Sequence, residues 1–294
     1  MKSNSEILKI YPDWAQELGQ KYLSRTINQF ILHGNVHDLT TVKNSNDFKF
    51  VRLKTFLSEE FFGARDYVMF YDRSSGIYFR DQESKTDFNR ALAGRDVIEG
   101  TEYAKKMPKD PVRVFSLLEK YFRSRIEQNK SIALIIDYAE TIVPAHEAGS
   151  SGSEDRNALV FLMKWAHDPL FLAADFTTTL LAENLADLNR TLVQHPYTSE
   201  IRLPLPGEES RHAFIGNYAS NKTKLDISPQ QLEVLAQQTA GLNFVNIEGM
   251  MARSNQDAKK FSTDELLVQK KELIEAEAYG LLEFVEITLL DTRK

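Results

Sequence analysis

The sequence predicts an α/β fold in which a parallel, mostly five-stranded sheet lies between helices and is followed by a helical lid. Ile132–Ile136 is a near-continuous apolar run, which is typical of a strand buried on both faces. Thr177–Ala182 reads as a second buried strand, and Asn157–Ala166 between them has helical apolar spacing. After Gly207 the pattern is helical. Strands that alternate with helices and then give way to helices indicate a sheet domain with a small lid.

The first 128 residues supply further elements of the same kind. Apolar residues recur every four positions in 13–25, which predicts a helix, and the run 30–32 predicts a short strand that ends in a turn at Gly34-Asn35. Asp110-Pro111 is a helix start, with a carboxylate cap and a proline in the first turn. The remaining expectations are a helix at 51–62, a strand at 67–71, a turn at 72–76, a second strand at 77–79 and a helix that ends near 128.

The second half of the chain predicts the rest of the sheet and the lid. We expect a short helix at 185–192 and a last strand at 200–205. Helices centred on 211–218, 230–238, 245–253 and 264–278 then form the lid, with an extended tail at 281–290. The expected domains are therefore an α/β domain over 1–206, a lid over 207–279 and a connector or tail over 280–294. The Gly- and Ser-rich segment within 145–154 predicts a mobile loop.

Composition excludes several classes of protein. The chain has 294 residues, of which 42% are hydrophobic and 27% charged, as in ordinary globular domains. A net charge of −6 argues against a general nucleic-acid binder, which needs clustered Lys and Arg. The absence of cysteine excludes disulfides and thiolate metal sites, and it fits a reducing cytoplasm. No apolar run approaches the ~18 residues of a membrane span, so we expect a cytoplasmic protein without membrane contact.

The strongest candidate for a chemical site is the string IALIIDYAE, residues 132–140. A buried strand ends there in Asp137, and a second acid, Glu140, follows three residues later. Carboxylates at the end of such a strand can hold Mg²⁺ and polarise a water molecule. The structural alternative, equally supported by this string alone, is that Asp137 caps the turn into the next helix.

A second candidate is the string TTTLLAEN, residues 177–184, another buried strand that ends in polar residues, Glu183 and Asn184. If the two strands are neighbours in a parallel sheet, Asp137 and Asn184 lie close together at its carboxyl edge, where open α/β sheets bind ligands. The alternative for Asn184 is that it caps the helix predicted from Leu185.

Taken in order, these strings resemble the AAA+ ATPase family. Residues 200–215, a strand and two prolines followed by an Arg-bearing helix, resemble the passage from the last strand into the lid, and GLNFVNIEGMMAR, residues 241–253, resembles the sensor 2 helix. The resemblance covers roughly residues 30–258. It implies a P-loop-NTPase-like core, a Walker B role for Asp137 with Mg²⁺, a catalytic role for Glu140 and a sensor 1 role for Asn184. In the family the two Walker B acids are adjacent, whereas here Tyr138 and Ala139 separate them.

The chain departs from the family at the phosphate-binding loop. A P-loop needs G-x-x-x-x-G-K-[ST], because glycine amides cradle the phosphates and the lysine neutralises them. After the first strand this chain reads HGNVHDLT, residues 33–40, without that pattern. Gly34, Asn35 and, in the lid, Gly241 remain as weak candidates for cofactor binding. Between Asn184 and Arg202 the only arginine available as an arginine finger is Arg190.

The C-terminal string KKELIEAEAYGLLEFVEITLLD, residues 270–291, resembles the connector between a degenerate first AAA+ module and an active second one in tandem proteins. That resemblance implies a second AAA+ module or ATPase as partner, with a homo-oligomer as a further possibility. His33 and His37 are four residues apart, but the Gly34-Asn35 turn between them disfavours a helical zinc site.

Three functions follow from these observations. The first is a degenerate AAA+ module that acts in assembly, substrate handling or regulation of an ATPase, with no cofactor of its own. The second is an active ATPase that binds ATP and Mg²⁺ through an atypical loop. The third is a nucleic-acid-associated module, which the acidic charge disfavours. The missing P-loop favours the first over the second.

Overall fold

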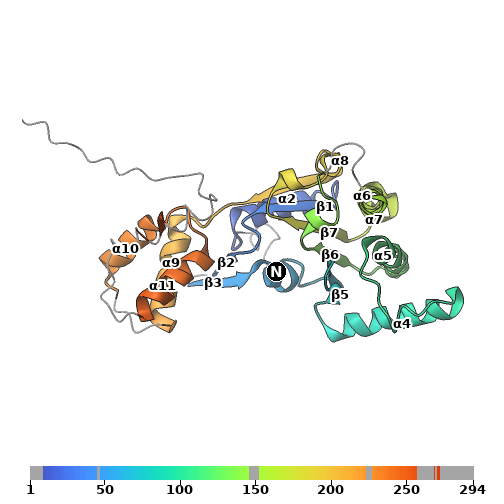
Figure 1. The fold of residues 1–294 in the computed structure, drawn as a ribbon, viewed down its shortest axis with the longest axis horizontal. Helices are drawn as coiled ribbons and strands as arrows, with labels where there is room; N and C mark the ends of the chain where they lie inside the picture. Colours follow the sequence, from blue (N-terminus) through green and yellow to red (C-terminus); the bar gives the residue numbers. More distant parts are fainter. Residues whose placement is uncertain are drawn as a thin grey trace, which may run out of the picture. The chain divides into compact units, whose positions relative to one another are not determined.

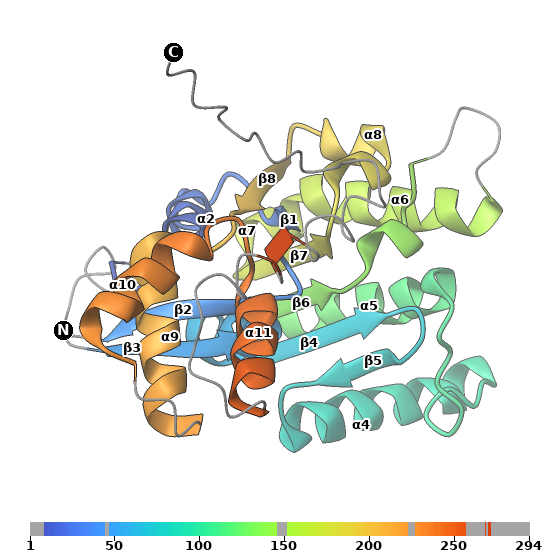
Figure 2. The ribbon, with the colours of Figure 1, turned by 60° about the vertical axis from the view of Figure 1, so that its left-hand side comes forward.

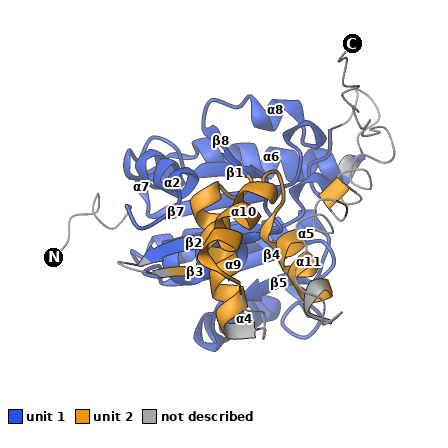
Figure 3. Cartoon of the chain, turned by 90° about the vertical axis from the view of Figure 1, so that its left-hand side faces the viewer, with its two compact units in different colours: residues 1–45, 49–204 blue, residues 46–48, 205–294 orange. Residues whose placement is uncertain are grey.

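The chain divides into two compact units, which are described separately. A computed structural model describes residues 9–44, 47–145, 152–222 and 227–256, together with 268, 270 and 271. The first unit comprises residues 1–45 and 49–204, and the second comprises 46–48 and 205–294 (Figure 3).

The first unit is built on a six-stranded sheet with the order β5-β4-β6-β7-β1-β8 (Figures 1 and 2). Five strands are parallel, as predicted, and β5 pairs antiparallel with β4 at one edge. The strands are β1 Gln29–Gly34, β4 Tyr67–Asp72, β5 Gly76–Phe79, β6 Ile132–Ile136, β7 Phe176–Ala182 and β8 Thr198–Leu203. The mixed α/β class with a mostly parallel sheet is thus confirmed.

Helices bury both faces of this sheet, which explains why its strands are apolar without alternation. Along β6, Leu134 packs into the cluster formed with α5, α6 and α7, whereas Ala133 and Ile135 pack into the cluster formed with α2 and the segment after β3. Successive side chains of a strand point to opposite faces, so each face receives its own set. The helices are α2 Asp13–Leu23, α4 Gln82–Glu99, α5 Pro111–Ile126, α6 Ser153–His167, α7 Pro169–Ala173 and α8 Arg190–Val193.

Helix α4 was missed by sequence analysis, because its sequence is polar and only a thin stripe of it is buried. Phe88 and Leu92 are its large buried side chains, and Asp81 caps its first turn by accepting a hydrogen bond from the Ser84 amide. Helix α5 begins as predicted, with the Asp110 carboxylate accepting from the Arg113 amide.

The segment after β1 differs most from expectation. A hairpin of β2, Leu39–Asn44, and β3, Asp47–Arg52, follows the Gly34 turn, and no sequence pattern was assigned to it. The predicted helix 51–62 begins two residues late, because β3 extends through Arg52. It consists of α3, Leu53–Thr55, followed by a π-helical turn, Phe56–Phe61.

Two further segments refine the predictions in the first unit. The expected helix at 185–192 is a 3₁₀ turn, Leu185–Asp187, followed after two residues by the separate helix α8. The expected mobile loop at 145–154 lies mostly outside the described residues. Among the helices that the structure describes, none combines the length and apolarity that crossing a bilayer requires.

From Glu208 onwards the described part of the second unit is helical, which confirms the predicted helical lid. It contains α9 Glu208–Lys222, α10 Pro229–Gln238 and α11 Phe244–Gln256. A capping box of Ser228 and Gln231 starts α10. Arg211 of α9 is buried and donates hydrogen bonds to the carbonyl oxygens of Pro206 and Ala236, so this arginine holds the unit together. Most of the predicted helix 264–278 and the whole tail 281–290 lie outside the described residues.

Candidate functional site

The predicted site residues of the first unit gather at the carboxyl edge of the sheet. Asp137 directly follows β6, and Asn184 follows β7 after Glu183. Because β6 and β7 are paired and parallel, their carboxyl ends lie at the same edge, as expected. Gly34 ends β1, the next strand along, and its amide donates a 2.9 Å hydrogen bond to the carbonyl oxygen of Glu183. The residues at these three neighbouring strand ends, Gly34, Asp137, Glu183 and Asn184, are called the edge cluster below.

Asp137 is buried and fully engaged by groups of the chain itself. Its Oδ2 accepts a hydrogen bond from Lys54 Nζ at 2.7 Å, and its Oδ1 accepts from the Tyr138 amide at 3.1 Å. The Asp137 side chain is 3% exposed, whereas that of Lys54 is 45% exposed. Lys54 is the second residue of α3, so the short helix after β3 places its ammonium group against the end of β6. Tyr78 Oη of β5 lies 3.4 Å from the same nitrogen.

The pKa directions agree with a charged lysine and a neutral tyrosine in this contact. Burial lowers the pKa of Lys54, but the hydrogen bond and charge of Asp137, helped by Tyr78, outweigh that effect and raise it overall. Burial raises the pKa of the Tyr78 hydroxyl, and the positive charge of Lys54 only partly opposes this. The edge cluster therefore holds a stable ion pair at neutral pH.

Glu140 lies in a 3₁₀ turn, Ala139–Thr141, and is partly buried. Its Oε2 is buried and has no hydrogen-bond partner among the residues that the structure describes. Burial raises the pKa of Glu140, and the charges of Glu183 and Asp137 add to this effect, while His37 opposes it. The fold therefore disfavours the ionised form of this carboxyl group.

An aromatic and acidic rim lies beside these carboxylates. The His37 ring stacks on Tyr138 with 5.2 Å between ring centroids, and His37 Nε2 lies 3.4 Å from Glu183 Oε1. Tyr138 has a φ of 51°, a left-handed backbone conformation that is uncommon for a residue with a Cβ atom, and it is 48% exposed. The tight backbone after Asp137 presents this ring at the surface.

The turn after β1 uses its amides inside the protein. The amides of Gly34, Asn35 and Val36 donate to the carbonyl oxygens of Glu183, Leu203 and Gly34, at 2.9, 3.1 and 2.8 Å. Gly34 has a φ of +97°, and an added Cβ there would lie 2.7 Å from the Leu203 oxygen. A P-loop works by presenting free amides to a phosphate. In this turn three consecutive amides already donate to carbonyl oxygens of the protein, two of them outside the turn. The turn therefore does not fit the phosphates of ATP.

Asn184 lies at the same edge of the sheet, but its side chain is exposed and makes a separate contact. It donates to Asp187 Oδ2 at 3.1 Å and does not cap the following turn through its side chain. Arg190 is exposed at the start of α8. Gly241, with a φ of +86°, connects α10 to α11 in the second unit. Among the described residues, no group of three or more His, Cys, Asp or Glu could hold a metal ion.

Lys54 was missed by sequence analysis. A P-loop lysine is expected directly after the first strand, in HGNVHDLT, whereas Lys54-Thr55 lies after the β2–β3 hairpin, at the start of the next helix. A Lys-Thr pair at a helix start is the sequence signal that could have identified it, because the P-loop motif ends in the same two residue types.

Comparison with known proteins identifies the family. Residues 4–204 match the family described as AAA+ chaperone, N-terminal Rossmann-like domain, and residues 209–279 match AAA+ chaperone, second helical domain. The chain therefore belongs to the AAA+ chaperone family.

Solved structures support the same fold. A chain in the structure of the E. coli MS115-1 HORMA:CdnC:Trip13 complex is similar with a TM-score of 0.53 and 17% identity, over 91% of this chain and 85% of that one. No curated protein matches the sequence.

Proposed function

We propose that this chain is a degenerate AAA+ module that acts in assembly, substrate handling or regulation of an ATPase, and that it does not hydrolyse ATP itself. The observation that carries the proposal is the Lys54–Asp137 ion pair at the carboxyl edge of the sheet. In an active AAA+ site this aspartate would orient Mg²⁺. Here a cation of the chain already lies 2.7 Å from it.

Two physical arguments support the absence of tight nucleotide binding. Mg²⁺ would have to displace the Lys54 ammonium group from the Asp137 carboxylate, whose side chain is 3% exposed. The protein would then lose the charge-assisted hydrogen bond between these two groups. The triphosphate would meet a turn whose amides are engaged, next to the exposed carboxylate of Glu183. This carboxylate repels a polyanion unless a cation screens it.

A role through contacts follows from the same account. The family description, AAA+ chaperone, supports a module that acts through contacts with other proteins. That the partner is a further ATPase module rests on the resemblance of residues 270–291 to the connector of tandem proteins. The similar fold occurs in a complex of several proteins, HORMA, CdnC and Trip13. A module that has kept the sheet and lid without a phosphate cradle is suited to positioning partners in such an assembly.

One observation favours the alternative of a weak ATPase. Lys54 and Thr55 are the residue types of a P-loop lysine and its Mg²⁺-binding hydroxyl, and they begin a helix at this edge of the sheet. If the ion pair opened, Lys54 could turn from Asp137 towards a phosphate. The alternative therefore requires an opened state of the same contact.

Phosphate release by the purified chain with Mg²⁺ and ATP distinguishes the two functions. The wild type is compared with Asp137→Ala, and Arg156→Glu serves as a control on the exposed surface of α6. We expect none of the three proteins to exceed the background rate. Turnover by the wild type and the control that is lost in Asp137→Ala would refute the proposal and establish the enzyme.

A further inference from the structure

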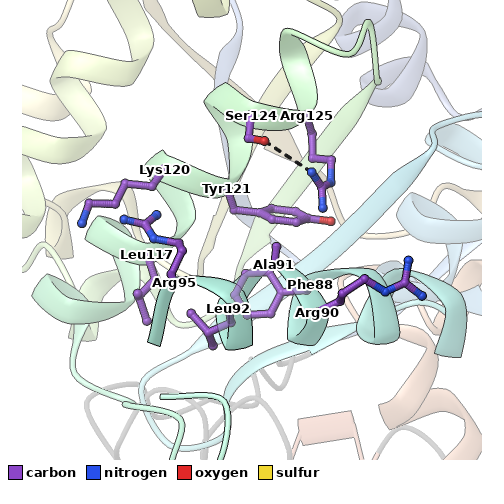
Figure 4. A pocket seen from close by; sticks show the side chains of 10 residues that line it. All are labelled: Phe88, Arg90, Ala91, Leu92, Arg95, Leu117, Lys120, Tyr121, Ser124 and Arg125. Atoms are coloured by element: carbon purple, nitrogen blue, oxygen red, sulfur yellow. Dashed lines mark hydrogen bonds between the residues drawn. The ribbon is translucent and has the colours of Figure 1, made fainter. Parts of the chain in front are cut away.

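A groove of about 440 Å³ lies between α4 and α5, away from the edge cluster (Figure 4). Its floor is apolar and is formed by Phe88 and Leu92 of α4 and by Leu117 and Tyr121 of α5. The rings of Phe88 and Tyr121 meet edge to face, with 4.9 Å between centroids, and so fix the two helices against each other. The groove is thus a built feature of the helix pair.

Four cations surround this floor, and none of the described residues that line the groove is a carboxylate. They are Arg90 and Arg95 from α4 and Lys120 and Arg125 from α5. Figure 4 shows Arg95 and Lys120 together at one end of the floor and Arg125 at the other, with the Tyr121 ring between them. An occupant therefore meets positive charge at both ends, whereas the floor side chains are only 1–5% exposed and offer it little apolar surface.

Carboxylates outside the groove neutralise only part of this charge. Asp87 accepts from Arg125 Nε at 2.7 Å, and Glu99 bonds both Arg95, at 2.6 Å, and Lys120, at 3.0 Å. Among the ion pairs that the structure describes, these two carboxylates offset two of the four cations and leave two positive charges, although Arg90 also lines an adjoining groove that contains Asp81 and Glu83. Arg90 is exposed and makes no ion pair with any residue that the structure describes.

The spacing of the cations defines the charge pattern of a complementary ligand. Arg90 and Arg95 are five residues apart on α4, as are Lys120 and Arg125 on α5, which corresponds to about 7.5 Å along each helix axis. Acidic residues at positions i and i+4 of a helix are about 6 Å apart along its axis and lie on one face. A helix with two such acids and an apolar residue between them matches both ends and the floor.

An exposed apolar pair continues α4 beyond the groove. Val97 is 86% exposed and Ile98 is 84% exposed, the highest values among the large apolar side chains that the structure describes. Ile98 lies seven residues after Ala91, which lines the groove, and so falls on the same face of α4. A ligand that follows α4 can therefore bury Ile98 as an additional anchor.

From this combination we infer that the α4–α5 groove binds an acidic, amphipathic helical segment of a partner protein. The charge surplus selects for acid, and the exposed Val97 and Ile98 select for an amphipathic helix over a fully polar chain. A nucleic-acid strand is a poorer match, since two surplus charges neutralise few phosphates and the groove walls offer no extended cationic track. The surface is separate from the edge cluster, so the inference stands whether or not the chain binds ATP.

The direct test is the binding of a fluorescein-labelled peptide of about fifteen residues, with Glu and Leu at helical spacing, followed by fluorescence anisotropy. The counterpart peptide carries Lys in place of Glu. We expect saturable binding of the acidic peptide alone. The double variant Arg90→Glu/Lys120→Glu should weaken it by about tenfold or more, and Arg156→Glu on α6, with the same type of charge change, should leave it within about twofold.

A second variant protects the test against misfolding. Val97→Ser and Ile98→Ser alter side chains that are exposed, so together they should weaken the acidic peptide without lowering the unfolding midpoint. The inference is overturned if no saturable binding occurs at about millimolar peptide, if the basic peptide binds equally, or if the charge variant binds like the wild type. It is also overturned if single-stranded DNA displaces the peptide, or if the groove variants abolish self-association of the chain, which would assign the surface to a nucleic acid or a second copy.

Discussion

Replacement of Lys54 by methionine removes the ammonium group from Asp137 and keeps much of the aliphatic side chain. At the observed 2.7 Å, two unit charges attract by about 6 kcal/mol at an effective dielectric constant of about 20, and by about 1.5 kcal/mol in water. The Lys54 side chain is 45% exposed, so the lower part of this range applies. Holding a lysine in one rotamer costs up to about 2 kcal/mol, but the variant also leaves a buried carboxylate without its cation. We expect a net loss of about 1–3 kcal/mol.

A double-mutant cycle separates the ion pair from the other effects of substitution. Asp137→Asn alone should also destabilise the chain, whereas Lys54→Met/Asp137→Asn should lose less than the sum of the two, with a coupling of about 1–2 kcal/mol. Urea unfolding followed by tryptophan fluorescence is suitable, because both tryptophans, Trp14 and Trp165, lie in the first unit. Additive losses would refute the ion pair as a stabilising contact and would remove the main support for a closed site.

The coupling energy between Lys54 and Asp137 should weaken only at strongly basic pH. Its contact with Asp137 raises the pKa of Lys54 above the usual lysine value of about 10.5, despite the opposing effect of burial. A lysine whose folded pKa is raised contributes stability that is fully present below the unfolded pKa and is lost as pH rises through the folded pKa. With respect to Lys54, the coupling should therefore stay constant from neutral pH to about pH 9 and fall only in stronger base. A decline between pH 7 and 8 would contradict the assignment.

Three further outcomes follow from single side chains. Burial raises the pKa of Glu140, so its ionised form opposes folding, and Glu140→Gln should stabilise the chain at pH 7 but not near pH 4, as measured by thermal unfolding. Gly34→Ala should cost about 1–3 kcal/mol, because its φ is +97° and its Cβ would lie 2.7 Å from the Leu203 oxygen; Gly94→Ala, where a Cβ meets nothing, is the control and should not destabilise. A backbone hydrogen bond lowers the pKa of Asp66 to about 2, so stability from this group is present above about pH 4 and lost as pH falls through 2. Asp66→Asn should therefore destabilise the chain at pH 7 and have little effect near pH 2, and equal losses at both values would contradict this.

The sheet could be predicted because strands that are buried on both faces must be apolar at every position. Ile132–Ile136 and Thr177–Ala182 meet that condition, and the polar residues that follow them mark the carboxyl ends of the strands. The pairing of these strands then brings Asp137 and Asn184 to one edge. The location of the candidate site therefore followed from the sequence once the strands were assigned.

The contents of that edge could not be predicted in the same way. The partner of Asp137 is Lys54, which is 83 residues distant and is positioned by a hairpin that no pattern had indicated. Helix α4 escaped detection because it buries few apolar side chains, so its apolar stripe is too thin to stand out from its polar sequence. The use of the Gly34, Asn35 and Val36 amides within the backbone likewise depends on strands that are distant in sequence. Contacts between residues so distant in sequence can be identified only once the fold is known.

Calorimetric titration of Mg²⁺-ATP into the purified chain tests the central claim most directly, with Lys54→Met and Asp137→Asn measured beside the wild type. The ion pair and the engaged amides predict no saturable binding by the wild type at concentrations up to about a millimolar. Lys54→Met should not create tight binding, because the amides of the turn after β1 remain engaged. Saturable binding by the wild type with a Kd of about ten micromolar or below, lost in both variants, would contradict the account and show that Lys54 and Asp137 hold the nucleotide.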